Sequence, residues 1–263
     1  MDFRIQYHCK QSWPSLAWVA RCSIENPIII VHHGPGVEVH GDWFCEAVWH
    51  GEFTTGGFDQ TDLVFGTGAR LRDDQVIFVS PGSTVDRLQY AEHDGNFLIS
   101  NSLACLISAS NIKVDPTYDR YPTLLRSITR GIDNYEKSLP TLSGRVELVY
   151  FRNIVWNGKE LKLDDKPVIE RDLNSFDKYR EFLATSLAGI AANMQDSRRN
   201  HRYSMISGIS SGYDSTTATV LAHESGLDEA FSFHTARGGS KDHGMEIAQI
   251  LGIKLTLVDR MDW

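Results

Sequence analysis

Short apolar runs separated by turn residues dominate the first 115 residues of the chain. Ile28-Ile29-Ile30-Val31 and Val76-Ile77-Phe78-Val79 are two such runs, and Gly, Pro, Asp and Asn lie between the runs at the spacing of hairpins. Asp94-Gly95 separates two further runs and suits a turn with positive φ. The pattern predicts β-structure with a hairpin at Asp94-Gly95, followed by a short helix over 101–110.

The pattern is mixed between residues 116 and 172. Residues 118–132 fit a helix, and Asn157-Gly158 lies between two short apolar runs and predicts a second hairpin. Asp164-Asp165-Lys166-Pro167 is charged and contains a proline. We therefore place a domain boundary between about residues 150 and 174.

An amphipathic helix is predicted after this boundary, with Ser175 or Asn174 as its N-cap. Its apolar face is made by residues that recur every three or four positions: Tyr179, Leu183, Leu187, Ile190 and Met194.

From Tyr203 onward, strand and helix patterns alternate. The strands are predicted over 203–206, 230–233 and 254–258, and the helices over 216–225 and 242–251. This β-α-β-α-β order implies parallel strands with right-handed crossovers. The predicted fold class is therefore α/β, with a β-rich domain over 1–155 and the start of a parallel-sheet domain over 174–263.

The net charge and the apolar content mainly exclude some classes of partner and location. The chain has 26 Lys and Arg against 34 Asp and Glu, a net charge of −8, which argues against wrapping nucleic acid or binding anionic lipid. No stretch approaches the ~20 apolar residues that span a bilayer, and the N-terminus has no apolar signal core. We therefore expect a cytoplasmic protein that has neither nucleic acid nor membrane as a partner. The cysteines have no metal-type spacing and are expected to be buried: Cys9, Cys22, Cys45 and Cys105.

The candidate chemistry lies in the turn between the strand at 203–206 and the helix at 216–225. This turn is Ser207-Gly208-Ile209-Ser210-Ser211-Gly212-Tyr213-Asp214-Ser215-Thr216. Small residues let the backbone approach a ligand, and the amides and dipole at the start of the following helix favour an oxyanion. The hydroxyls of Ser210, Ser215 and Thr216 are suited to donate to phosphate oxygens, and Asp214 fits beside phosphate if it holds Mg²⁺. The alternative is an ordinary βα turn in which Asp214 or Ser215 caps the helix.

The segment Ser210 to Thr216 resembles the pyrophosphate loop (PP-loop) of the asparagine synthetase-like ATP pyrophosphatases, whose pattern is Ser-Gly-Gly-x-Asp-Ser-Ser/Thr. Ser211 stands where the family usually has its first glycine. Phe231-Ser232-Phe233 resembles the family's second strand, and Ile247 to Gly252 resembles part of the helix that follows. Upstream, Asp86 to Tyr90 and Phe97 to Leu103 resemble segments of the family's N-terminal amidotransferase-like domain.

This resemblance implies a ligase that converts ATP to AMP and pyrophosphate. A small-molecule carboxylate would attack the α-phosphorus to give an acyl-adenylate, and an amine or ammonia would then displace AMP to form an amide. The resemblance also implies an Ntn-amidotransferase-like fold for 1–155, a PP-loop fold over 174–263, and ATP and Mg²⁺ as cofactors. It places Asp214 at the metal, Phe233 beside the adenine, and the following residues at the phosphates: Ser210, Ser211, Gly212, Tyr213, Asp214, Ser215 and Thr216.

The chain departs from this family in two ways. Glutamine-hydrolysing members use a cysteine as residue one, whereas position 2 here is Asp2 and the nearest cysteine is Cys9, so we expect no glutaminase activity. The family's second acidic motif and its transition-state lysine do not occur between Asp214 and residue 263. We therefore expect an incomplete PP-loop domain whose catalytic residues lie downstream of residue 263.

Two other functions remain open. One is a degenerate module that binds a nucleotide or a partner without catalysis. The other is a serine hydrolase, because Gly208-Ile209-Ser210-Ser211-Gly212 also matches the G-x-S-x-G elbow with Ser210 as nucleophile. The hairpins upstream disfavour the hydrolase, whose candidate partner residues are His234, His243, Asp242 and Asp259.

Two weaker candidate sites lie elsewhere in the chain. His32, His33 and His40 suggest a metal, but adjacent residues of a strand point to opposite faces, so a shared ion is not expected. The segment Arg237 to Lys241 is a basic loop that either contacts a phosphate or carboxylate or is a plain helix entry capped by Ser240.

Overall fold

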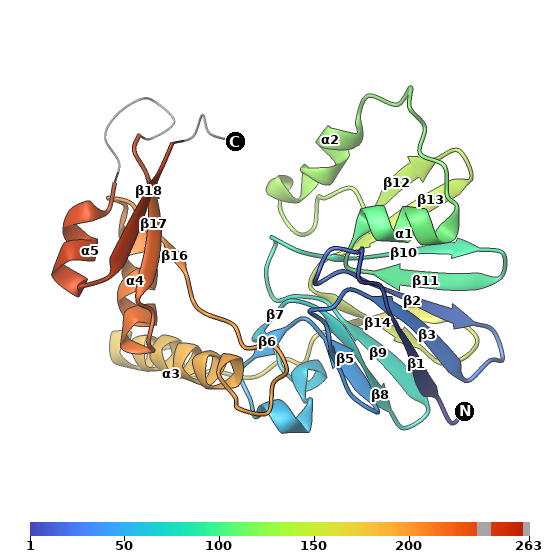
Figure 1. Ribbon diagram of the computed structural model, residues 1–263, viewed down its shortest axis with the longest axis horizontal. Helices are drawn as coiled ribbons and strands as arrows, with labels where there is room; N and C mark the ends of the chain where they lie inside the picture. The colour runs from blue at the N-terminus through green and yellow to red at the C-terminus, as the bar shows by residue number, and fades with distance from the viewer. Residues whose placement is uncertain (236–242, 260–263) are drawn as a thin grey trace. The chain divides into compact units, whose positions relative to one another are not determined.

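Two compact units make up the chain, Met1–Ile169 and Glu170–Trp263. The computed structural model describes residues 1–235 and 243–259. Both units combine strands with helices, and strand outweighs helix over the described chain taken together, so the chain is of the α/β class (Figure 1). The division after Ile169 falls within the predicted boundary range of 150–174, and before it β15 (Leu161–Asp165) forms a hairpin with β14 (Arg152–Trp156).

Two sheets form most of the first unit. The seven-stranded sheet contains β1 (Arg4–Cys9), β2 (Trp18–Ser23), β3 (Ile28–His33), β10 (Leu88–His93), β11 (Asn96–Ser100), β12 (Ser138–Thr141) and β13 (Gly144–Val149), in the order β1-β3-β2-β11-β10-β13-β12. The six-stranded sheet contains β4 (Glu38–Val39), β5 (Trp43–Cys45), β8 (Gly68–Arg72), β9 (Gln75–Val79), β14 and β15, in the order β15-β14-β9-β8-β5-β4. A separate two-stranded ribbon pairs β6 (Val48–Trp49) with β7 (Val64–Phe65). Within the larger sheet β1 and β3 run parallel, whereas β2 is antiparallel to β3.

The main core lies between these two sheets. Ile29, Leu88 and Ile99 of the larger sheet belong to the same buried cluster as Phe78 and Trp156 of the smaller one. Alternate side chains of a strand point to opposite faces, so one face of each sheet supplies this cluster. The two predicted hairpins are confirmed: Asp94 and Gly95 have positive φ between β10 and β11, and the Asn157-Gly158 segment joins β14 to β15.

A helix covers the other face of the seven-stranded sheet. α1 (Leu103–Ser110) is capped by Ser102, whose side chain accepts the N–H of Cys105, and it packs Leu106 against Val19 and Leu98. The helix predicted over 118–132 is broken into α2 (Tyr121–Leu125) and a 3-10 turn over Ser127–Arg130.

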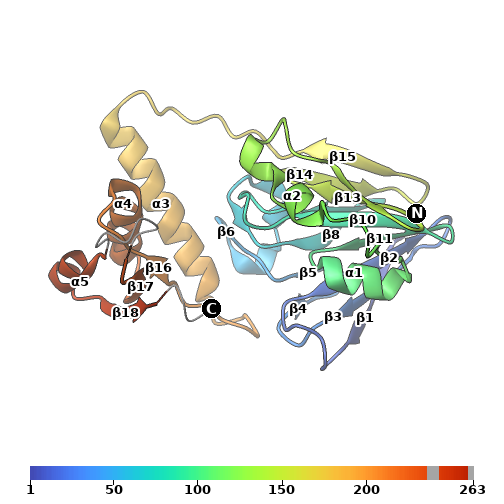
Figure 2. The same cartoon turned by 90° about the horizontal axis from the view of Figure 1, so that it is seen from above.

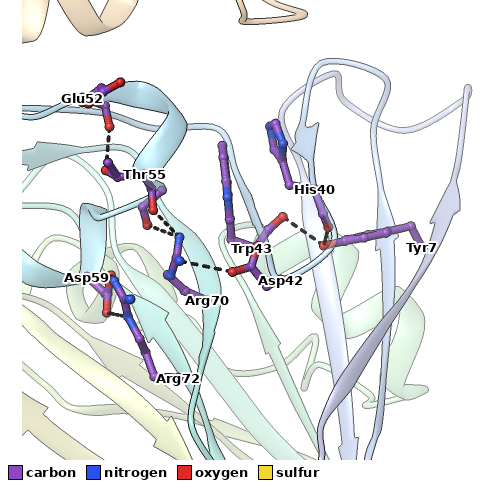
Figure 3. Close-up of polar contacts among 10 residues, drawn as sticks. Tyr7, His40, Asp42, Trp43, Glu52, Thr55, Asp59, Arg70 and Arg72 are labelled. Atoms are coloured by element: carbon purple, nitrogen blue, oxygen red, sulfur yellow. Dashed lines mark hydrogen bonds and ion pairs between the residues drawn. The ribbon is translucent and has the colours of Figure 1, made fainter.

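A cluster of aromatic rings fills one end of the smaller sheet. Trp43 contacts Trp49, Phe53 and Phe58 edge-on, and the His40 ring stacks on it with centroids 3.7 Å apart. Arg70 ties the neighbouring loop to the sheet by donating to the carbonyls of Thr55 and Gly56 and pairing with Asp42 (Figure 3).

Gly56 at this point has φ +56, and a Cβ there would lie 2.2 Å from the Arg70 guanidinium. Its backbone conformation and its lack of a side chain both let the loop close on Arg70.

The second unit is a small parallel sheet with helices. β16 (Ser207–Gly208), β17 (Glu229–Phe233) and β18 (Lys254–Val258) are ordered β16-β17-β18 and run parallel. α4 (Tyr213–Glu224) connects the first pair and α5 (Met245–Leu251) the second. α3 (Phe176–Met194), which begins at the predicted cap Ser175, packs against α4 (Figure 2). A separate core of Ile209, Ala222, Leu227, Ala230 and Ile253 holds the unit together.

The four cysteines do not all have the exposure that was expected. Cys22, Cys45 and Cys105 are buried as expected, but Cys9 is exposed, because it is the last residue of β1 and that strand lies at the edge of its sheet. In the described part of the chain, none of the helices has the length and hydropathy that crossing a bilayer requires.

Candidate functional site

The Ser210–Thr216 turn lies at the carboxyl end of β16, where the chain passes into α4. β16 pairs with β17 through Ser207 opposite Ala230 and Gly208 opposite Phe231. The strand predicted over 203–206 is therefore wrong by several residues. Tyr203 is tied instead to the end of α3, where its N–H donates to the Met194 carbonyl and its carbonyl accepts from Gln195.

The first turn of α4 is open to solvent. Gly212 is the N-cap and no side chain caps the helix there, so neither Asp214 nor Ser215 acts as the cap. Tyr213 is 92% exposed, and Asp214 is exposed on the same turn. α4 begins at Tyr213 rather than at Thr216 as predicted, which places Asp214 and Ser215 inside the positive end of the helix dipole.

The hydroxyl groups of the turn are hydrogen-bonded to one another and to the backbone. The Ser210 and Ser215 oxygens lie 2.8 Å apart, and Ser215 Oγ also accepts the N–H of Ser210 at 3.1 Å. Thr216 Oγ1 donates to the carbonyls of Gly212 at 2.9 Å and Ser210 at 3.2 Å. These hydroxyls were expected to face a phosphate, so binding one requires that they exchange bonds they already make.

Gly212 has extended rather than left-handed backbone angles, so its role is one of space. A Cβ at Gly212 would lie 3.3 Å from Ser210 Oγ. The Gly212 N–H also donates to that oxygen at 3.2 Å. A larger residue would crowd the serine pair and the approach to the helix N-terminus.

Phe233 ends β17 at the same edge of the parallel sheet as the turn. Its ring is half-buried and meets Phe231 edge-on, with centroids 6.0 Å apart and planes at 87°. The ring of Phe231 in turn lies 3.2 Å from where a Cβ on Gly208 would be. Two aromatic rings therefore lie close to the strand that leads into the turn.

Two buried hydroxyl residues that the sequence analysis did not single out hydrogen-bond to the backbone in and next to the turn. Ser232 is buried, donates to the Ile209 carbonyl at 2.7 Å and accepts the N–H of Gly244 at 3.3 Å. Thr219 is fully buried, donates to the Ser215 carbonyl and shares a hydrogen bond with Ser207, both at 2.7 Å. The available signal was a polar residue on the face of a predicted strand or helix that should pack inward.

Among the described residues, no acid or histidine is hydrogen-bonded to Ser210 Oγ, as a serine hydrolase would require. In the described part of the chain, the hydrogen bonds of Ser210 Oγ join it to Ser215 and Gly212. Of the candidate partner residues, His234, His243 and Asp259 are described, whereas Asp242 and the loop from Arg237 to Lys241 lie outside the described residues.

The remaining candidates from the sequence, Cys9 and the histidines of β3, lie in the first unit. Cys9, at the end of β1, has Gln11 Nε2 3.4 Å from its sulfur. His32 and His33 project from opposite faces of β3 as predicted, since His32 lies beside His8 and His33 beside Tyr7. Among the described residues, no group of three or more His, Cys, Asp or Glu side chains is placed to hold a metal ion.

No protein-family model matches the chain, and no curated protein matches it either.

Proposed function

We propose that the Ser210–Thr216 turn binds the pyrophosphate portion of ATP, and that the chain belongs to an asparagine synthetase-like, AMP-forming amide ligase without glutaminase activity. The observation that supports this proposal most strongly is the solvent-exposed N-terminus of α4. This helix follows a strand of a parallel sheet and has no side-chain cap at Gly212. Ligands of open α/β sheets bind at the carboxyl ends of strands, and helix N-termini favour anions. The resemblance of this segment to a PP-loop supports the same assignment.

Each residue of the turn has a role in this proposal. The backbone N–H groups at the start of α4 would bind the β- and γ-phosphates, and Ser210 and Ser215 would donate their hydroxyl hydrogens to phosphate oxygens. Binding energy at this point counts most as pyrophosphate leaves, because negative charge on it grows in the transition state. Phe233 would border the adenine from the neighbouring strand.

Asp214 is the residue that would hold Mg²⁺. Its carboxylate is exposed in the first turn of α4, and carboxylate and phosphate oxygens are the ligands Mg²⁺ prefers. The ion would supply Lewis-acid stabilisation of the phosphate charge. It also explains how a carboxylate is tolerated where a polyanion binds, since the ion neutralises both.

Nucleotide binding tests the first half of the proposal. Titration of the whole chain with ATP by calorimetry, with and without Mg²⁺, should give saturable binding that Mg²⁺ strengthens. Asp214→Asn should remove most of the Mg²⁺ effect, and Ser210→Ala should weaken binding. Ser225→Ala, at the far end of α4, is the matched control and should bind as the wild type does.

Catalysis tests the second half and separates the three candidate functions. A ligase of this class should exchange labelled pyrophosphate into ATP when a suitable carboxylate is present. Nucleotide binding without exchange across a panel of carboxylic acids would favour the non-catalytic module. Labelling of Ser210 by a fluorophosphonate would favour the hydrolase.

A further inference from the structure

His8 and His32 lie directly opposite each other on adjacent parallel strands. The register of β1 and β3 pairs His8 with His32, and their ring centroids are 5.2 Å apart with planes tilted by 33°. Side chains at the same register project from the same face of a sheet, so the two imidazoles are neighbours there. His33 lies on the opposite face, where its Nδ1 is 2.8 Å from the Gly34 carbonyl oxygen.

One ring nitrogen of His32 is unsatisfied within the part of the chain that the structure describes. Its Nδ1 is buried and has no hydrogen-bond partner among the described residues. Buried polar atoms almost always have a partner, so an orphaned imidazole nitrogen calls for an explanation. His8 contributes a second half-buried imidazole at the distance given above.

Burial and nearby charges disfavour the protonated form of His32. Burial is the largest cause that lowers its pKa, followed by coulombic interactions with Lys10, His8, Arg21 and His33. A neutral imidazole has a lone pair available for a metal ion, whereas a protonated one does not. The cations Lys10 and Arg21 also repel a divalent ion, which weakens a metal site here.

The backbone around the pair is held in place. The Lys10 N–H donates to the His33 carbonyl at 2.7 Å, and the Trp13 N–H donates to the Lys10 carbonyl at 3.1 Å. Trp13 thereby lies beside His32, with ring centroids 6.3 Å apart. The two histidines and the tryptophan form one group on the same end of β1 and β3.

We propose that His8 and His32 form a two-nitrogen chelate for a divalent transition metal ion, with Cu²⁺ bound most tightly. Imidazole is a preferred ligand of Cu²⁺, Ni²⁺ and Zn²⁺, and for a given set of ligands Cu²⁺ is the strongest of the divalent first-row series. Two protein ligands leave the remaining positions to water. The site is independent of the Ser210–Thr216 turn and of the ligase proposal.

Copper titration of the whole chain tests this proposal. Calorimetry with Cu²⁺ at pH 7.4 should resolve a site that His8→Gln and His32→Gln each weaken by about tenfold or more, because each removes one of two ligands. His93→Gln is the control, since His93 lies on β10 next to Asp94 and away from the pair.

Two spectroscopic readouts place the ion. Electron paramagnetic resonance of the first equivalent of Cu²⁺ should show nitrogen ligation that His8→Gln reduces. Trp13 emission should be quenched in the same titration, and Trp13→Phe should remove that part of the quenching while Cu²⁺ still binds.

Unchanged copper affinity in His8→Gln would overturn the proposal, as would an equal loss in His93→Gln. Far-UV circular dichroism checks that the variants fold. If His32→Gln, which replaces the buried Nδ1, does not fold, His8→Gln decides the question alone.

Discussion

The hydroxyl oxygens of Ser210 and Ser215 lie 2.8 Å apart and share a hydrogen bond across the bend between β16 and α4. Ser215 Oγ also accepts the N–H of Ser210, so this one side chain closes the bend in two ways. In the proposed function, phosphate oxygens take over as acceptors for these hydroxyls. The turn is then already close to its ligand-bound shape, which lowers the ordering cost of binding.

Replacing Ser215 tests this relationship. Ser215→Ala should weaken ATP·Mg²⁺ binding by about tenfold or more, because a hydrogen bond to a charged group contributes about 1.5–3 kcal/mol. The thermal midpoint should fall slightly, because the variant removes the acceptor of the Ser210 N–H. Ser225→Ala is the control, and calorimetric titration is the measurement. Equal affinity in Ser215→Ala and the wild type would remove this serine from the site.

Glu46 should make the stability of the first unit fall as the pH rises from about 4.5 to 7. Burial raises its pKa to about 7, more than offsetting the hydrogen bonds that its Oε1 accepts from Thr67 and Asn101. In this pH window the native state keeps a proton that the unfolded state releases, so the free energy of unfolding decreases with pH.

Glu46→Gln should abolish that slope. The free energy of unfolding of Glu46→Gln minus that of the wild type should increase by at most about 3 kcal/mol between pH 4.5 and 7. Urea unfolding followed by tryptophan fluorescence measures it, with Glu92→Gln, at an exposed position of β10, as control. A constant difference between Glu46→Gln and wild type across the window would contradict the prediction.

Lys166 should act in the opposite direction at higher pH. Burial lowers its pKa to about 8, and its ammonium donates to the Ser80 carbonyl and to Asn153 Oδ1. Between about pH 8 and 10.5 the unfolded state binds a proton that the native state does not, so the Lys166 contribution to stability rises with pH. The unfolding free energy of the wild type should therefore rise relative to that of Lys166→Met over this window. An exposed lysine, Lys159, replaced by Met should leave no such trend.

The ion pair between Arg72 and Asp59 should contribute far more to the free energy of unfolding than the exposed ion pairs do. Arg72 donates twice to the Asp59 carboxylate, at 2.8 Å each, and the Asp59 side chain is only 3% exposed (Figure 3). Asp59→Ala should destabilise the first unit by about 3 kcal/mol, because it leaves a partly buried guanidinium without its partner.

The exposed pair of Arg4 and Asp2 supplies the comparison. Its side chains are 79% and 87% exposed, so Asp2→Ala should cost less than about 1 kcal/mol. A double-mutant cycle with Arg72→Met gives the coupling energy for the buried pair. A coupling no larger than that of the surface pair would show that solvent screens both alike.

Local chemistry made part of the fold predictable from sequence. Asp94-Gly95 favours positive φ, and the hairpin of β10 and β11 forms there. Strand β18 has the bounds predicted, and α3 begins at the predicted cap Ser175, because apolar spacing and a capping side chain are local signals. The β-rich first part and the parallel sheet of the last part followed from the same patterns.

Long-range pairing made the rest unpredictable. The apolar alternation from Tyr203 to Ile206 suggests a strand, but Tyr203 is hydrogen-bonded to the end of α3 and β16 forms further on. The register of β1 against β3, which brings His8 to His32, is not encoded in either strand alone. At the candidate site the motif located the turn, while the support from Thr219 and Ser232 depends on packing across elements.

A crystal structure of the chain with Mg²⁺ and a non-hydrolysable ATP analogue tests the proposed pyrophosphate site most directly. We expect the β- and γ-phosphates at the N-terminus of α4, with Ser210 and Ser215 donating to them and Asp214 holding the ion. Nucleotide bound elsewhere, with the serine pair and the start of α4 untouched, would contradict the proposal.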